Sequence, residues 1–496
     1  MLTRSSFASC AAVFYWYVEA TESPETAPVS LWTNGGPGCS GLIGFMTEQG
    51  PFHVGPDGGL EKNGFAWNTV ANMLFIEQPV GVGFSYSTDE ADNTMGDWDA
   101  ARDNFAAIQV FLERFPAIAG NDFYISAESY GGHYMPTLAK YIVDHTPNPI
   151  NFKGFAVGNP FTSKYSNTYG EITTLWGHQL TSKPLYDQWV DDCTGWYFNN
   201  MEAEKKGLLG DRLKPYKCLM DETEILERVE FSLNPYALDY PTCPKKDATG
   251  KKVPVAVAPG ERGGGRFGSA QRLALMRQTF ADEPQVIKAV ERALARGAAE
   301  AAGVVPGSST DDAQMWTEYE PCSDDYANTY LNRLDVQQAI HVNGGAAKAN
   351  DTLVEWEECS RKIRYNTTDG RTPMMPIYSY LLNASNNFNL KIMVFSGDDD
   401  MVCATSGSQE WIYDLGFEVM PNRSWHAWHY EDAKYGEQTA GFVVNFKEGA
   451  ENGMSGHFAF VTAHGCGHEV PTYKPQLALE LWKNYLSGDV YTKLIQ

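Results

Sequence analysis

The sequence has few basic residues relative to its acidic ones. Its 496 residues include 38 Lys and Arg against 62 Asp and Glu, which leaves a formal net charge of −24 at pH 7. A surface with this excess of negative charge repels phosphate backbones and anionic lipid headgroups. The composition therefore argues against nucleic acid and membrane as partners. It suits a mildly acidic compartment, where protonation brings the net charge closer to zero.

Long apolar runs are also absent, and none approaches the roughly 20 residues of a membrane-spanning helix. Residues 1–12 lack the sustained apolar core of a secretory signal peptide. Nine cysteines nevertheless point to the secretory pathway, as do sequons at Asn350, Asn366, Asn383 and Asn422. We expect a truncated N-terminus rather than a cytosolic protein, and a glycoprotein that is extracellular or located in a vacuole or lysosome.

The chain alternates between short apolar runs and helical segments, which predicts an α/β protein with a mostly parallel sheet covered by helices. Strands are predicted at 13–18, 29–33, 72–77, 123–125, 152–157, 391–396 and 457–462, and helices at 97–115 and 475–486. A Pro/Glu/Thr turn between the first two strands suggests a hairpin. No Cys/His spacing resembles a zinc site, so the sequence predicts neither a metal nor another cofactor.

The middle of the chain interrupts this alternation with irregular aromatic and helical segments, which predict an inserted, largely helical cap. The predicted division is a core first part at 1–161, the cap at 162–385 and a core second part at 386–496. Within the cap, residues 244–315 are of low complexity and predict a flexible, exposed linker. This linker is either a solvated insertion or a peptide excised by proteolysis.

One stretch has the layout of a nucleophile elbow, in which a sharp turn presents a Ser hydroxyl above a parallel sheet. The apolar run 123–125 precedes Ser129, and a helix-forming segment follows it. Ser129 and Gly131 fit the pattern G-x-S-x-G, whereas Ala127 replaces the first Gly. Alanine leaves room for close packing provided that its φ stays negative. By itself the motif is equally compatible with a chance match.

An acid and a base follow later predicted strands. Asp400 ends one acidic turn, and His468 follows another strand. The order Ser, Asp, His is that of α/β-hydrolases, and active sites form at the carboxyl edge of parallel strands. A Ser hydroxyl needs a base, and the imidazole needs a carboxylate to hold its tautomer. Asp398, Asp399 and His464 are alternatives at this stage, as is a turn without catalytic function.

Several longer motifs resemble the serine carboxypeptidases. They are Trp32-Thr-Asn-Gly-Gly-Pro-Gly-Cys-Ser40, Glu77-Gln-Pro-Val-Gly-Val-Gly-Phe-Ser-Tyr-Ser87, Glu128-Ser-Tyr-Gly-Gly-His-Tyr-Met-Pro136, Gly158-Asn159, Tyr330-Leu-Asn-Arg-Leu-Asp-Val-Gln337 and Gly467-His-Glu-Val-Pro471. The likeness covers about 11–240 and 321–496. It implies an α/β-hydrolase fold and release of C-terminal residues from peptides or proteins through an acyl-enzyme, favoured at acidic pH. It requires no cofactor and allows a homodimer.

The resemblance also implies roles for individual residues. Ser129 matches the nucleophile, His468 the general base, and Asp400 the acid that orients the base. The oxyanion hole maps onto the backbone N–H groups of Gly36 and Tyr130. Glycine at position 36 makes physical sense, because the backbone must approach the substrate carbonyl without a Cβ in the way.

An exopeptidase must also recognise the free carboxylate of its substrate. The family does this with an Asn side chain, a Gly N–H and a hydrogen-bonded pair of glutamic acids, which match Asn34, Gly35, Glu48 and Glu128. Two carboxyl groups in contact retain a proton, and the protonated group can donate to the substrate carboxylate. Binding should therefore weaken as the pH rises. The alternative for Glu48 is a surface acid.

Two further residues are predicted to border the pocket of the departing residue. The charge of Glu469 would favour a basic C-terminal side chain, unless Glu469 faces solvent. Cys403 either lines the same pocket or is a buried structural thiol. By resemblance, Cys39–Cys359, Cys193–Cys218 and Cys243–Cys322 form disulfides, and Cys10, Cys403 and Cys466 remain free.

Two other function classes compete with peptide hydrolysis. Some members of the family transfer the acyl group to an alcohol or amine instead of water, and only the acceptor pocket separates the two reactions. The third class is a catalytically vestigial protein that protects or binds a partner. Asn34, Glu48 and Glu128 favour the peptidase, and the complete Ser, Asp, His set argues against the vestigial protein.

Overall fold

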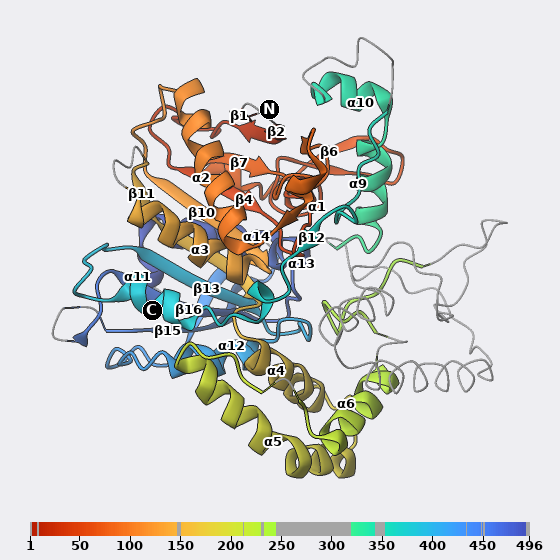
Figure 1. Ribbon diagram of the computed structural model, residues 1–496, viewed down its shortest axis with the longest axis vertical. Helices are drawn as coiled ribbons and strands as arrows, with labels where there is room; N and C mark the ends of the chain where they lie inside the picture. Colours follow the sequence, from red (N-terminus) through yellow and green to blue (C-terminus); the bar gives the residue numbers. More distant parts are fainter. Residues whose placement is uncertain are drawn as a thin grey trace.

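The computed structural model describes residues 2–6, 9–145, 150–211, 213–229, 233–244, 319–342, 353–432, 434–447, 449 and 452–492. Its centre is a nine-stranded sheet in the order β14-β15-β16-β13-β11-β10-β4-β7-β3 (Figure 1). The strands are β3 (Tyr15–Val18), β4 (Val29–Thr33), β7 (Asn72–Ile76), β10 (Phe123–Ser129), β11 (Phe152–Pro160), β13 (Lys391–Gly397), β14 (His426–Asp432), β15 (Gly436–Asn445) and β16 (His457–Ala463). The pairs from β7 to β16 are parallel, as predicted, and antiparallel strands lie at both edges.

The hairpin predicted for the first two apolar runs is wrong. β7 lies between β3 and β4, antiparallel to β3 and parallel to β4. Every residue of β4 is buried, whereas β3 is only partly buried. A strand buried on both faces belongs inside the sheet, where it needs a partner on each side. β7 and β10 are those partners, and β3 forms the edge.

Helices cover both faces of the sheet, as the alternation predicted. Neighbouring residues of one strand enter opposite cores: Phe155 and Val157 pack with α2 (Asp97–Arg114) and α3 (Gly131–Asp144), and Ala156 packs on the side of α14 (Pro475–Ser487). This two-sided burial explains why the strands read as continuous apolar runs. The other elements of the core are β1 (Leu2–Ser6), β2 (Ser9–Val13), α1 (Leu42–Thr47), β5 (Phe52–Val54), β6 (Leu60–Lys62), β8 (Tyr86–Ser87), β9 (Thr94–Met95), α12 (Thr405–Asp414), α13 (Val470–Tyr473) and α15 (Asp489–Thr492).

A separate helical group lies at one end of the molecule (Figure 1). It consists of α4 (Lys164–Gly177), α5 (Lys183–Lys205) and α6 (Tyr216–Val229), which share their own apolar cluster. Later in the chain come α9 (Ser323–Leu331), α10 (Leu334–Ala339), β12 (Arg364–Tyr365) and α11 (Met375–Leu382). The domain boundaries remain predictions, and residues 245–315 of the predicted linker 244–315 lie outside the described residues.

The three predicted disulfides are confirmed. Cys39–Cys359 joins segments that are 320 residues apart, Cys193–Cys218 joins α5 to α6, and Cys243–Cys322 joins the two sides of the linker region. Cys403 and Cys466 are free and buried, also as predicted. In the described part of the chain, no helix is long and apolar enough to span a membrane.

Candidate functional site

Ser129 lies at a sharp turn between β10 and α3. It is the last residue of the strand, its φ is 59°, and the helix begins two residues later at Gly131. A left-handed φ is uncommon for a residue with a side chain and often marks a functional turn. The strain therefore falls on Ser129, while Ala127 stays in the pleated strand. A Cβ at position 131 would lie 2.4 Å from the Ala127 Cβ, so alanine fits at 127 because Gly131 has no side chain.

Asp400 and His468 form a buried pair. Asp400 Oδ2 lies 2.7 Å from His468 Nδ1, and the two side chains are 0% and 2% exposed. Asp400 also accepts hydrogen bonds from the backbone N–H groups of Val402 and Cys403, at 2.8 and 3.1 Å. Because a carboxylate only accepts, His468 carries its proton on Nδ1, which leaves Nε2 able to act as a base.

Asn159 was given no role by the sequence, although it belongs to one of the family-like motifs. Its Nδ2 donates to Asp400 Oδ2 at 2.9 Å, and its side chain also bonds both backbone groups of Gly397. The available signal in the sequence was an Asn just after the apolar run 152–157, within a family-like motif. Its contacts fix the turn that carries Asp400, so Asn159 is a positioning residue for this pair.

The alternative acids and histidine have other partners. Asp398 lies 2.7 Å from Nδ1 of His464, whose side chain is 66% exposed. Asp399 lies 3.3 Å from Nε2 of His178, at the end of α4. The structure therefore brings together Asp400 and His468 in the interior, whereas the Asp398–His464 pair is at the surface.

His178 links the group of α4, α5 and α6 to the acidic turn, and this contact predicts a pH-dependent stability. The 3.3 Å contact with the Asp399 carboxylate raises the pKa of His178 from 6.5 to about 9, against the opposing effect of burial. A raised pKa in the folded state stabilises the fold fully below pH 6.5, and this contribution is lost as the pH rises through about 9. We expect His178→Gln to lower the unfolding midpoint at pH 6 but not near pH 10. A difference that is the same at both pH values would contradict the assignment.

A glycine-rich loop lies directly against the Ser129 turn. A Cβ on Gly35 would lie 2.4 Å from the Tyr130 backbone N, and 2.8 Å from the Ser129 Cβ. Gly36 has a φ of 114°, which favours glycine. The disulfide of Cys39 fixes the loop to a distant segment. The backbones of Gly36 and Tyr130, the predicted oxyanion donors, thus belong to two segments in close contact beside Ser129.

Two buried glutamates converge on one amide beside this turn. Asn34 Nδ2 donates to Glu48 Oε1 and to Glu128 Oε1, both at 2.8 Å. Asn34 Oδ1 accepts from Trp32 Nε1 at 2.9 Å and from Gly44 N at 3.1 Å, which fixes the orientation of the amide. Glu48 is 0% exposed, so its reading as a surface acid is wrong. Asn34, Glu48 and Glu128, which the sequence predicted as a group, lie together.

Glu469 and Cys403 are also buried, which excludes the solvent-facing reading of Glu469. Burial raises the pKa of the Cys403 thiol well above its ordinary value, and the charge of Asp400 adds to this effect. A hydrogen bond with the Ser129 side chain acts in the opposite direction. Cys403 is thus a neutral thiol in contact with Ser129. Its position in a pocket for the departing residue, like that of Glu469, remains a prediction.

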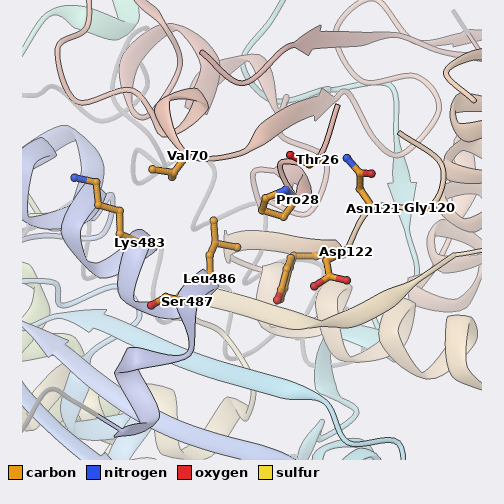
Figure 2. A pocket seen from close by; sticks show the side chains of 10 residues that line it. Thr26, Pro28, Val70, Gly120, Asn121, Asp122, Lys483, Leu486 and Ser487 are labelled. Atoms are coloured by element: carbon orange, nitrogen blue, oxygen red, sulfur yellow. The ribbon is translucent and has the colours of Figure 1, made fainter. Parts of the chain in front are cut away.

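Two other features of the described residues do not compete with this site. A cavity of about 670 Å³ lies near the start of β4 and β10, where Pro28 and Asp122 line it together with Leu486 of α14 (Figure 2). That is the amino edge of the sheet, and Ser129 lies at the carboxyl end of β10. Among the described residues, Cys193, Cys218 and Glu222 lie close enough to hold a metal ion, but the two sulfurs form a disulfide and are not thiolate ligands.

This chain has relatives among known proteins. The sequence model of the family described as Serine carboxypeptidase matches residues 6–488. Two relatives from Arabidopsis thaliana, Serine carboxypeptidase-like 26 and Serine carboxypeptidase 24, are each 32% identical, with 96% of this chain and 86% of the relative covered. The solved structure of the prohormone-processing carboxypeptidase Kex1(delta)p from Saccharomyces cerevisiae superposes with a TM-score of 0.64 at 18% identity, over 97% of this chain and 88% of that one. That likeness, together with the sheet, shows an α/β-hydrolase fold.

Proposed function

Because the chain belongs to the serine carboxypeptidase family, we propose that it hydrolyses C-terminal residues from peptides or proteins. Ser129 acts as the nucleophile, His468 as the general base and Asp400 as the acid that orients the base. The 2.7 Å contact between Asp400 and His468 Nδ1 supports the last two roles. The left-handed turn that exposes Ser129 at the end of β10 supports the first.

In the first step, Ser129 Oγ attacks the carbonyl of the terminal peptide bond while His468 Nε2 takes its proton. The bond to the departing residue then breaks, and the imidazolium donates the proton to the leaving nitrogen. Water, deprotonated by His468, hydrolyses the resulting acyl-enzyme and regenerates Ser129. In both steps the oxyanion is stabilised by the N–H groups of Gly36 and Tyr130. Each such donor typically contributes about 3–4 kcal/mol to the transition state.

The observation that carries the exopeptidase assignment is the amide of Asn34 shared by Glu48 and Glu128. Two anions at this place would repel a substrate carboxylate, so the pair must hold a proton when substrate binds. The protonated carboxyl, the Asn34 amide and the Gly35 N–H would then donate to the terminal carboxylate. Binding requires the protonated pair, so it weakens as the pH rises and the proton is lost.

The proposed carboxyl pair favours acidic working conditions. The disulfides, the sequons and the net charge support a compartment of the secretory pathway. Three disulfides form in oxidising environments. The Asn residues of the sequons at Asn366, Asn383 and Asn422 are exposed, as N-glycosylation requires. Together with the large negative charge, they support an extracellular or vacuolar/lysosomal glycoprotein. A homodimer remains compatible with the family.

The test compares an N-blocked dipeptide with its C-terminal amide from about pH 4 to pH 8, where carboxyl pairs titrate. We expect the free acid to be cleaved faster at low pH, and this preference to fall as the pH rises. Glu128→Gln should make the preference nearly independent of pH, because its amide donates at every pH. The matched control is Glu469→Gln, which removes another buried acid outside the Asn34, Glu48 and Glu128 group and should keep the pH dependence.

The outcomes separate the competing functions. Equal cleavage of acid and amide at every pH would contradict recognition of the carboxylate. Labelling of Ser129 by a serine-reactive fluorophosphonate without hydrolysis would favour acyl transfer to an alcohol or amine. A protein that neither reacts with the phosphonate nor cleaves would be a vestigial binding protein.

A further inference from the structure

A second buried acid lies behind the nucleophile turn. Asp97, the first residue of α2, is 2% exposed. Its Oδ1 accepts from the hydroxyls of Tyr130 and Tyr365, at 3.1 and 2.6 Å. Its Oδ2 lies 2.9 Å from His133 Nδ1, which must carry the proton because the carboxylate accepts. None of these three contacts involves Ser129, His468 or Asp400.

The burial of this carboxylate is costly unless donors surround it. Two phenols and an imidazole N–H supply three hydrogen bonds, and the amino end of α2 adds a favourable dipole. Burial raises the pKa of Tyr130 well above its ordinary value, and the charge of Asp97 adds to the effect, so this hydroxyl stays a donor. On the other side, the backbone N of Asp97 donates to Asp369 Oδ2 at 2.8 Å.

Tyr130 and His133 connect this acid to the helix that follows the nucleophile. Both lie at the first turn of α3, with ring centroids 4.6 Å apart and ring planes 14° apart. The Tyr365 and Tyr130 rings pack in a T-shaped arrangement, with centroids 5.5 Å apart. The Tyr130 side chain is therefore held by the hydrogen bond at its hydroxyl and by two ring contacts. The backbone N–H of Tyr130, the proposed oxyanion donor, belongs to the residue directly after Ser129.

We propose that Asp97 is a positioning residue for the oxyanion hole: through the Tyr130 hydroxyl and His133 it fixes the first turn of α3, and with it the direction of the Tyr130 N–H. This inference rests on the proposed function, because an oxyanion donor acts only if Ser129 forms tetrahedral intermediates. A donor that is misplaced by about 1 Å can cost up to about 10²-fold in rate. The effect appears in kcat, because the oxyanion forms only in the transition state.

Two substitutions of the same chemistry form a matched test, because both phenols donate to the same oxygen of Asp97. Tyr130→Phe should lower kcat about 10-fold and leave KM within about 2-fold, since the freed ring no longer fixes the N–H. Tyr365→Phe removes an equivalent hydrogen bond from β12, which does not carry an oxyanion donor. It should leave kcat within about 2-fold, with a similar loss of stability.

Asp97 itself provides the second comparison. Asp97→Ala removes the acceptor for all three donors and should lower kcat about 10²-fold. Asp97→Asn keeps one oxygen for the phenols and should recover about 10-fold of that loss. If the Asp97 variants do not fold, the tyrosine pair alone decides. Equal falls in kcat for Tyr130→Phe and Tyr365→Phe, or a change confined to KM, would overturn the inference.

The rate of Ser129 phosphonylation by a fluorophosphonate separates this inference from the proposed function, because that reaction also uses the oxyanion hole. A wild-type protein that is labelled but releases no C-terminal residue would overturn the peptidase assignment. The inference would still predict slower labelling of Tyr130→Phe than of Tyr365→Phe. Equal labelling rates in a protein that hydrolyses peptides would overturn the inference alone, and a wild-type protein that is not labelled would overturn both.

Discussion

Ser129→Ala is expected to abolish hydrolysis, with a fall in kcat on the order of 10⁶. Alanine has no hydroxyl at this position, so the proposed acyl-enzyme cannot form there. Fluorophosphonate labelling should vanish in parallel. The measurement is release of the C-terminal residue from an N-blocked dipeptide, together with mass spectrometry of the labelled protein.

The same strand offers a control for this substitution. Ser126 is a buried serine of the same strand, β10, and its Oγ donates to the backbone oxygen of Leu31 at 2.8 Å. Ser126→Ala removes the same atoms and should retain activity and labelling. If Ser129→Ala kept more than about 1% of the activity, another nucleophile would have to act. The thiol of Cys403, which contacts Ser129, would be the first to test.

Asp400→Asn is expected to lower kcat by about 10⁴-fold, because an amide does not hold the imidazole in the required tautomer. The hydrogen-bond partners of the Asp400 carboxylate are all donors. They are His468, the Asn159 amide and two backbone N–H groups. An NH₂ group placed there would face other donors. The imidazole would then shift or change tautomer, and the basic Nε2 would be lost.

Asp398→Asn is the matched control, two residues away in the same turn. It removes an acid of equal charge whose histidine partner, His464, is 66% exposed. Exposed pairs contribute about 0–1 kcal/mol, so we expect activity within about 2-fold of the wild type. The pH dependence of kcat/KM should change in Asp400→Asn only. Equal losses in the two variants would contradict the assignment of Asp400 as the orienting acid.

The local pattern was sufficient to predict most of the elements that carry the site. Apolar runs predicted the strands that end near Ser129, Asp400 and His468, because parallel strands buried on both faces leave such runs. The exception is instructive. The hairpin of β3 and β4 failed because β7, more than 35 residues later in the chain, takes the place between them. Sequence proximity alone does not specify which strand is the neighbour.

The family resemblance selected Asp400 among equivalent residues, and the tertiary structure supplies the physical difference between them. Asp398, Asp399 and Asp400 are chemically identical, and only their burial and partners distinguish them. The Ala at position 127 looked like a defect of the elbow. The structure shows that Gly131 provides the space and that the left-handed φ belongs to Ser129.

By itself, the sequence determined the family, the strand-turn-helix around Ser129 and the residue types that meet there, because these depend on local pattern and motif. Only the tertiary structure decided that Asn34 bridges Glu48 and Glu128, and that Asp97 lies behind Tyr130. Those contacts join residues from 14 to 94 positions apart. The physical reason is that burial, hydrogen-bond partners and hence protonation depend on which chain segments pack together, and local pattern does not specify that packing.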